Sequence, residues 1–207
     1  MVGRSLQGAP PRRARQEPRF WLSRLTTHDS RLTTGPPLRI IQGKLAGRRL
    51  TSPADQRVRP TAEKVRDAWL TLLDEEIQGA RILDLFAGTG ALGLEAISRG
   101  AAYADFVEFR PASLHALRAN VAALRLRERA RIYKKDAVPF TEALDEGRYD
   151  LAFADPPYGS KVLDRIIATW KARRFSRILT VEHAKEHAIP GGSLRKVFGD
   201  VAVTVYR

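Results

Sequence analysis

Residues 81–100 read RILDLFAGTGALGLEAISRG and decide the fold. A short apolar run breaks at a glycine-rich turn, and the turn opens a helical pattern that a further glycine closes. The segment Gly88-Thr-Gly-Ala-Leu-Gly93 matches the spacing G-x-G-x-x-G, and Glu108 follows its first glycine by 20 residues. Glycines in this context let the backbone approach a nucleoside cofactor, and the acidic side chain accepts ribose hydroxyls. The stretch therefore predicts a strand, a cofactor-binding turn and a helix.

Strands and helices alternate from this stretch onward. The expected strands are 81–86, 103–109, 130–134, 149–154, 176–182, 194–198 and 202–206, and the expected helices are 91–99, one opened by Pro111, 138–146 and 161–172. Repeated βα units predict a parallel sheet with right-handed crossovers and helices on both faces. Gly199-Asp200 is typical of a hairpin turn. The sequence thus predicts an α/β fold whose seven-stranded sheet is mostly parallel and ends in an antiparallel C-terminal hairpin.

Residues 38–78 precede this sheet and are expected to form a small hairpin and a helix. Apolar positions over 61–78 recur with helical spacing, and the arginine-rich segments 39–41 and 49–50 flank two glycines that suit a hairpin. Residues 79–207 would then be the catalytic domain. Residues 1–37 are rich in Pro and Gly without periodicity, which predicts a disordered basic leader. An RNA-binding extension, an organelle-targeting peptide and an artefact of start-codon choice remain open for that leader.

The net charge of +13 is concentrated at the start of the 207-residue chain. Residues 1–37 carry +5 and residues 38–66 carry +6, whereas the remaining 141 residues carry only +2. This asymmetry favours a polyanionic partner such as nucleic acid.

The absence of cysteine excludes disulfides, zinc–thiolate sites and cysteine nucleophiles. No apolar run suits a membrane span or a secretory signal, and no histidine has metal-ligand spacing, so a cytoplasmic protein without a metal is expected.

The segment Asp155-Pro156-Pro157-Tyr158 ends the fourth predicted strand. In a doubly wound sheet that strand lies beside the first one, at the edge where ligands bind. Consecutive prolines hold the backbone rigid, a carboxylate and a carbonyl accept the two hydrogens of an exocyclic amine, and an aromatic ring stacks on a base. Asp84 lies inside the first strand, where a carboxylate can meet a cationic group or bind amides of the glycine loop.

These motifs identify a family. Asp84–Glu95 together with Asp155–Tyr158 resembles the class I S-adenosylmethionine-dependent methyltransferases that act on amino groups, with their Rossmann-like fold. Arg39–Leu50, Arg59-Pro-Thr61 with Val65-Arg66, and Glu182-His183 are similar to the RsmD family, which methylates N2 of a guanine in bacterial small-subunit ribosomal RNA. The resemblance implies S-adenosylmethionine as cofactor and 16S ribosomal RNA, or a small-subunit assembly intermediate, as partner. A monomer is expected.

The resemblance also implies roles for individual residues. Catalysis is expected from Asp155, Pro156, Pro157 and Tyr158. Cofactor binding is expected from Thr61, Asp84, Phe86, Ala87, Gly88, Gly90, Glu108, Asp136, Ala137 and Asp155. RNA binding is expected from Arg39, Lys44, Arg48, Arg49, Arg59 and Arg66. Two departures from the family pattern are Gln42, where glycine is common, and Phe109-Arg110, where an acidic residue is frequent.

Other functions stay open on the residues alone. Asp-Pro-Pro-Tyr also suits an amino-methyltransferase acting on adenine or cytosine in DNA or another RNA. A nicotinamide-dependent oxidoreductase shares the glycine pattern but leaves Asp155–Tyr158 without a role. A non-catalytic RNA-binding assembly factor would keep the fold, although it would not need the glycine loop, Glu108 or Asp155.

Overall fold

The computed structural model describes residues 38–53, 63–157 and 161–207. Four parts of the predictions lie outside these ranges: the leader 1–37, Arg59, Thr61 and Tyr158.

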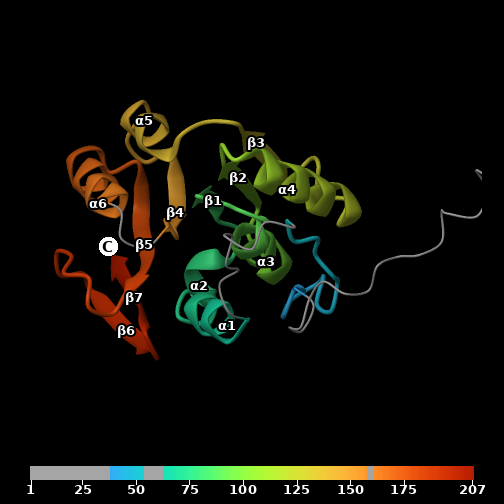
Figure 1. The fold of residues 1–207 in the computed structure, drawn as a ribbon, viewed down its shortest axis with the longest axis horizontal. Helices are drawn as coiled ribbons and strands as arrows, with labels where there is room; N and C mark the ends of the chain where they lie inside the picture. Colours follow the sequence, from blue (N-terminus) through green and yellow to red (C-terminus); the bar gives the residue numbers. More distant parts are fainter. Residues whose placement is uncertain (1–37, 54–62, 158–160) are drawn as a thin grey trace, which may run out of the picture. The chain divides into compact units, whose positions relative to one another are not determined.

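A single seven-stranded sheet organises the described chain (Figure 1). Its strands are β1 (Arg81–Leu85), β2 (Tyr103–Val107), β3 (Ala130–Tyr133), β4 (Tyr149–Ala154), β5 (Ser176–Ala184), β6 (Leu194–Phe198) and β7 (Val201–Tyr206). Their order is β3-β2-β1-β4-β5-β7-β6. β1 to β5 pair in parallel, whereas β7 pairs antiparallel with both β5 and β6. The predicted fold class is confirmed.

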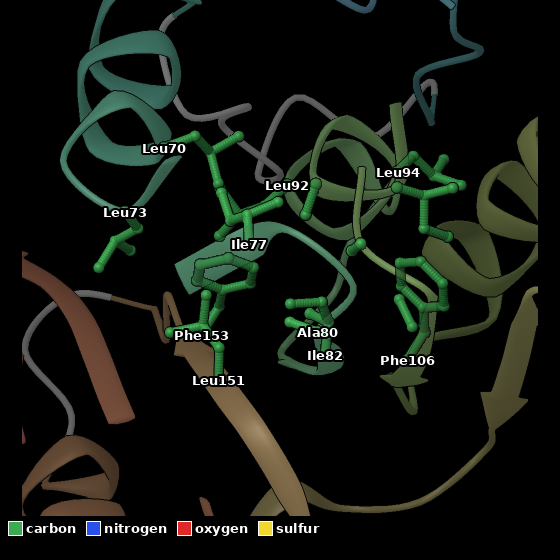
Figure 2. Packing of buried hydrophobic residues seen from close by; sticks show 14 of the residues in the cluster. Leu70, Leu73, Ile77, Ala80, Ile82, Leu92, Leu94, Phe106, Leu151 and Phe153 are labelled. Carbon is green, nitrogen blue, oxygen red and sulfur yellow. The ribbon is translucent and has the colours of Figure 1, made fainter. Parts of the chain in front are cut away.

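Helices cover both faces of this sheet. They are α1 (Glu63–Thr71), α2 (Asp74–Ile77), α3 (Ala91–Arg99), α4 (Pro111–Ala123), α5 (Ala137–Glu142) and α6 (Val162–Arg173). Successive strand residues point to opposite faces of the sheet and pack in two separate cores. Ile82 and Phe153 belong to one hydrophobic cluster, and Leu83 and Ala152 belong to the other. The first cluster packs the sheet against α1 to α4, and Figure 2 shows Ile77 beside Phe153 there, with Leu70 on the other side of Ile77. The second packs it against α5 and α6.

The helix expected over 61–78 is two helices, which corrects that prediction. α1 ends at Thr71, and Leu73 has φ −129° and ψ 15°, outside the helical region, before α2 begins. Leu73 and Ile77 are nevertheless both fully buried in the first cluster. The apolar spacing therefore predicted part of the buried face, including Trp69, Leu73 and Ile77, but it missed the fully buried Leu70. The break between the two helices leaves no trace in that spacing.

The segment 38–53 forms a compact loop closed by one β-bridge, between Arg39 and Arg49. Ile40 is fully buried in the first cluster, which fixes the segment to the helical layer. At Gly43, where φ is +82°, an added Cβ would lie 2.1 Å from the Ser98 carbonyl oxygen of α3. Only glycine permits so close an approach.

Within the described residues, none of the helices combines the length and the apolarity needed to cross a bilayer.

Candidate active site

Three strands deliver side chains to one edge of the sheet. Leu85 of β1 stands in register with Val107 of β2 and Ala154 of β4. The residues that follow these three leave the sheet together: Phe86, Glu108 and Asp155. The strand order reverses between β1 and β4, and ligands of open α/β sheets bind at such a switch point. The fold therefore brings the two predicted motifs to one place.

The turn after β1 carries left-handed backbone at a non-glycine residue. Phe86 has φ +62°, and Gly88 and Gly90 have φ +56° and +79°. A non-glycine residue in this region stores strain, and such strain clusters at ligand-binding sites. Among the residues that the structure describes, an added Cβ at Gly88 would meet only the Phe86 carbonyl oxygen within 4 Å, at 3.9 Å, whereas at Gly90 it would lie 2.4 Å from Leu117 Cδ1. Gly88 thus borders open space, and Gly90 is needed for packing.

Asp84 is buried at the end of β1. Its Oδ2 accepts a hydrogen bond from the Gly93 amide at 3.0 Å, so this carboxylate ties the strand to α3. Burial raises the pKa of Asp84 to about 7, the Gly93 bond opposes that rise, and the nearby carboxylates of Asp155 and Glu108 add to it. A buried carboxylate beside two others favours a cation over an anion as ligand.

Glu108 holds the glycine loop through its carboxylate. Oε2 accepts from the Gly88 amide at 2.9 Å, and Oε1 accepts from the amides of Phe109 and Arg110 at 2.9 and 2.8 Å. The Arg110 guanidinium lies 3.3 Å from the same carboxylate. The family departure at Phe109-Arg110 therefore supplies the counter-charge of Glu108. Arg110 Nε and Nη2 also donate to this carboxylate, each at 3.3 Å, so any ligand that binds Glu108 would have to replace one of these donors.

The other described candidates sit at the same edge with different exposure. Asp136 follows β3, is exposed, and caps α5 by accepting from the Val138 amide at 2.9 Å, while Ala137 is buried. Asp155 is half-buried, Pro156 is buried and Pro157 is exposed.

Some of the predicted RNA-binding residues are exposed to a phosphate, and one is not. Arg39, Lys44, Arg48 and Arg49 are exposed on the segment 38–53. Arg66 is fully buried on α1, where its Nη2 donates to the Arg39 carbonyl oxygen at 2.6 Å and its Nε lies 3.7 Å from Glu95 Oε2. The prediction that Arg66 contacts RNA is therefore corrected. It is a buried structural cation, and that burial lowers its pKa.

Glu95 anchors the segment 38–53, which carries the exposed cations and is called the cationic segment below. This role of Glu95 was not predicted. It is fully buried on α3, and its two oxygens accept from the amides of Ile41 and Gln42 at 2.8 and 2.7 Å. Gln42, the other family departure, adds a side-chain bond to Asp67 of α1 at 2.7 Å. An acidic residue within the otherwise apolar run Leu94-Glu95-Ala96 was the available signal.

The tip of this segment lies away from the strand edge. The Lys44 amide donates to the carbonyl oxygen of Ser98, in the last turn of α3, at 2.8 Å, and Arg48 Nη2 donates to the carbonyl oxygen of Ala123, the last residue of α4, at 2.9 Å. The glycine loop precedes the opposite end of α3. Lys44 therefore lies at the end of α3 that is remote from the glycine loop, and Arg48 lies beside the last residue of α4.

His183, near the end of β5, is part of the packing. His183 is buried, with Nδ1 2.8 Å from the Ala184 carbonyl oxygen and Nε2 2.9 Å from Thr204 Oγ1. Across the described ranges, His, Asp and Glu side chains form no group of three placed to hold a metal ion.

Comparison with known proteins identifies the family. The family model "Conserved hypothetical protein 95" matches residues 38–206. The chain belongs to this family, which is the RsmD family. Over 181 residues it is 31% identical to "Putative rRNA methyltransferase YlbH" of Bacillus subtilis, covering 82% of this chain and 98% of the relative. It is 35% identical to "Ribosomal RNA small subunit methyltransferase D" of Escherichia coli strain K12, covering 82% and 89%.

A solved relative has the same architecture. The structure titled "Putative methyltransferase yhhF from Escherichia coli" matches with a TM-score of 0.71 at 33% identity, covering 83% of this RsmD-family chain and 97% of that one. The expected family resemblance and the class I methyltransferase fold are both confirmed.

Two glycines of the same motif are expected to fail in different ways when replaced by alanine. Gly93→Ala would place a Cβ 2.5 Å from the buried Phe106 ring, so we expect overpacking to lower the free energy of unfolding by about 1–3 kcal/mol. Gly88→Ala has room but must hold φ +56°, which costs about 1–2 kcal/mol, and it fills the open side of the loop. Chemical denaturation should show a loss of stability in both variants, and cofactor titration separates the two. Equal loss of cofactor affinity in both variants would contradict this division.

Proposed function

We propose that this chain transfers a methyl group from S-adenosylmethionine to the exocyclic N2 amine of a guanine in 16S ribosomal RNA, in the cytoplasm. The observation that carries the proposal is the meeting of Asp84, Gly88 and Asp155 at one edge of the sheet. The names of the curated relatives, which are ribosomal RNA methyltransferases, support the reaction and the class of substrate.

The loop after β1 fits this cofactor. Gly88 borders open space, so the backbone can approach a ligand there, and the adjacent Asp84 is a buried carboxylate that a cation would stabilise. S-Adenosylmethionine carries a sulfonium and an ammonium group, and when bound it supplies an electrophilic methyl group. We assign the methionine end to the segment from Asp84 to Gly90, the ribose to Glu108 and the adenine edge to Asp136-Ala137.

Asp155 and Pro156 would hold the target amine. A guanine N2 amine has two hydrogens, and the Asp155 carboxylate and the Pro156 carbonyl oxygen can accept one each. Accepting both hydrogens directs the nitrogen lone pair away from the protein backbone and toward the cofactor side. Holding the nucleophile in line supplies most of what a displacement needs. N2 would gain the methyl group, the cofactor would leave as S-adenosylhomocysteine, and the proton that N2 loses during or after the attack would pass to water. Tyr158 stays a prediction as the stacking residue for the flipped base.

The exposed cations of the segment 38–53 would hold the RNA. Phosphate contacts position a nucleic acid without reading its sequence, and extruding a base costs a few kcal/mol that such contacts must offset. Arg39, Lys44, Arg48 and Arg49 are exposed for that purpose, whereas Arg66 is left out.

Reversing two of these charges tests the surface. We expect Arg48→Glu with Arg49→Glu to weaken RNA binding and to flatten its dependence on salt, because fewer counterions are released. Binding of 16S ribosomal RNA is measured across a salt series. The matched control reverses Lys171 and Arg173, which are exposed at the end of α6 on the other face of the sheet. A salt slope equal to that of the unaltered protein would refute the surface.

Cofactor affinity is expected to rise with pH through Asp84. Since its pKa is raised to about 7 in the folded protein, the carboxyl holds its proton below that pH and binds a cation poorly there. Folding stability contributed by this group falls as pH rises from its ordinary pKa toward 7, because the unfolded chain releases the proton earlier. One unit below its pKa about a tenth of the group is ionised, so we expect roughly tenfold weaker binding near pH 6 than near pH 8.

Calorimetric titration with S-adenosylmethionine across this range measures the effect, and Asp84→Asn is the control. Any titration of the ligand itself appears in both proteins. A pH dependence that survives unchanged in Asp84→Asn would show that another group is responsible.

The reaction itself is tested with purified protein, isotopically labelled S-adenosylmethionine and 16S ribosomal RNA that lacks this modification, both free and in partly assembled subunits. After nuclease digestion the label should co-migrate with N2-methylguanosine. Label on adenine or cytosine, or transfer to DNA instead, would favour the alternative amino-methyltransferase, and binding without transfer would favour a non-catalytic assembly factor.

A further inference from the structure

A buried amide on α4 joins the cationic segment to the glycine loop. Asn120 has 1% of its surface exposed. Its Oδ1 accepts from the Thr51 amide at 2.6 Å, and its Nδ2 donates to the Thr51 carbonyl oxygen at 3.0 Å and to the Thr89 carbonyl oxygen at 2.9 Å. One side chain therefore satisfies both backbone groups of Thr51 and one of Thr89.

Only an amide can make this set of contacts. The site requires one acceptor and two donors, which asparagine supplies and which an aspartate, having no hydrogen to donate when ionised, does not. Because the site is buried, each backbone group left without its partner costs free energy that water cannot restore. The position is thus specific for the amide rather than for polarity in general.

The two segments it joins have separate roles in the proposed reaction. Thr51 closes the segment whose exposed residues include Arg48 and Arg49, directly after the buried Leu50. Thr89 stands between Gly88, which borders open space, and Gly90, whose own packing partner is Leu117, one turn before Asn120 on the same helix. A shift of the segment would therefore be felt at the glycine loop through rigid, buried contacts.

We propose that Asn120 is a positioning residue that couples occupancy of the cationic segment by RNA to the conformation of the glycine loop that binds the cofactor. This inference rests on the proposed function. RNA bound to the segment shifts Thr51, the Asn120 amide transmits that shift to Thr89, and the loop then binds cofactor more tightly. By linkage, the cofactor tightens RNA binding by the same factor.

The experiment measures the affinity for S-adenosylhomocysteine, the cofactor product, in the presence and absence of saturating 16S ribosomal RNA. In the unaltered protein we expect RNA to tighten cofactor binding by about fivefold or more, within the usual range of coupling between sites. Asn120→Asp should bring that ratio close to one. Asn120→Ala, which removes all three bonds without adding a charge, serves as the second variant should the first fail to fold.

A matched control separates coupling from simple loss of stability. Ser176 is fully buried on β5, where its hydroxyl donates to the Ile178 carbonyl oxygen and accepts from the Trp170 indole, on the other face of the sheet. Ser176→Ala should lower the thermal midpoint and leave the ratio as in the unaltered protein.

The proposal is overturned if the unaltered protein shows a ratio of one, if both Asn120 variants keep the full ratio, or if Ser176→Ala loses it equally. Failure of the proposed function looks different, because the unaltered protein would then form no N2-methylguanosine. Failure of the coupling alone leaves that product and changes only the ratio.

Discussion

Replacing Asp155 with alanine is expected to lower the rate of methyl transfer by a factor on the order of 10² to 10⁴, with cofactor affinity changed far less. The factor is that of removing one group which holds the reacting atoms in line or accepts a developing charge. Asp155 leaves β4 half-buried at the shared edge, whereas the backbone loop and Asp84 provide most of the expected cofactor contacts. Single-turnover rates and titration with S-adenosylhomocysteine measure the two effects separately.

Two further variants sharpen this test. Asp155→Asn keeps one carbonyl acceptor but loses the charge, so its rate should fall between those of the alanine variant and the unaltered protein. Asp145→Ala changes an exposed acid elsewhere and should behave as the unaltered protein. Loss of cofactor affinity equal to loss of rate in Asp155→Ala would contradict the role given to this carboxylate.

Replacing Glu95 with alanine is expected to lower the free energy of unfolding by about 3–5 kcal/mol, because it removes the ion-pair partner of a buried cation. Arg66 and Glu95 are both fully buried, with Arg66 Nε 3.7 Å from Glu95 Oε2. The amides of Ile41 and Gln42 would also lose their acceptor. Urea denaturation gives the free energy.

The control is Glu75→Ala on α2, an exposed acid whose loss should stay within about 0.5 kcal/mol. Glu95→Gln keeps an acceptor for one amide but not the charge, and it should be intermediate. If Glu95→Ala cost no more than Glu75→Ala, the anchoring of the segment 38–53 would have to be assigned to other contacts, such as the bond between Lys44 and Ser98.

Much of the fold could be predicted because local patterns fix it. Helix 91–99 and strands 149–154 and 194–198 have the predicted bounds, since glycine turns and apolar runs end them sharply. The edge that gathers Asp84, Glu108 and Asp155 followed from the alternation of strands and helices, because parallel strands bring their carboxyl ends together.

What could not be predicted depends on contacts distant in the sequence. From the sequence, Arg66 is indistinguishable from a surface cation, because the residues around it do not show that it pairs with Glu95, 29 residues later. Asn120 is likewise an ordinary helix residue until Thr51 and Thr89 are placed beside it. The break at Leu73 preserves the apolar spacing, so the spacing could not predict it.

The most direct test of the proposed reaction is to map methylated nucleosides in 16S ribosomal RNA from cells with and without this gene. We expect one N2-methylguanosine that disappears with the gene, returns with the unaltered copy, and does not return with a copy encoding Asp155→Ala. An unchanged set of methylated guanines, or loss of a methyl group from adenine, cytosine or DNA instead, would contradict it.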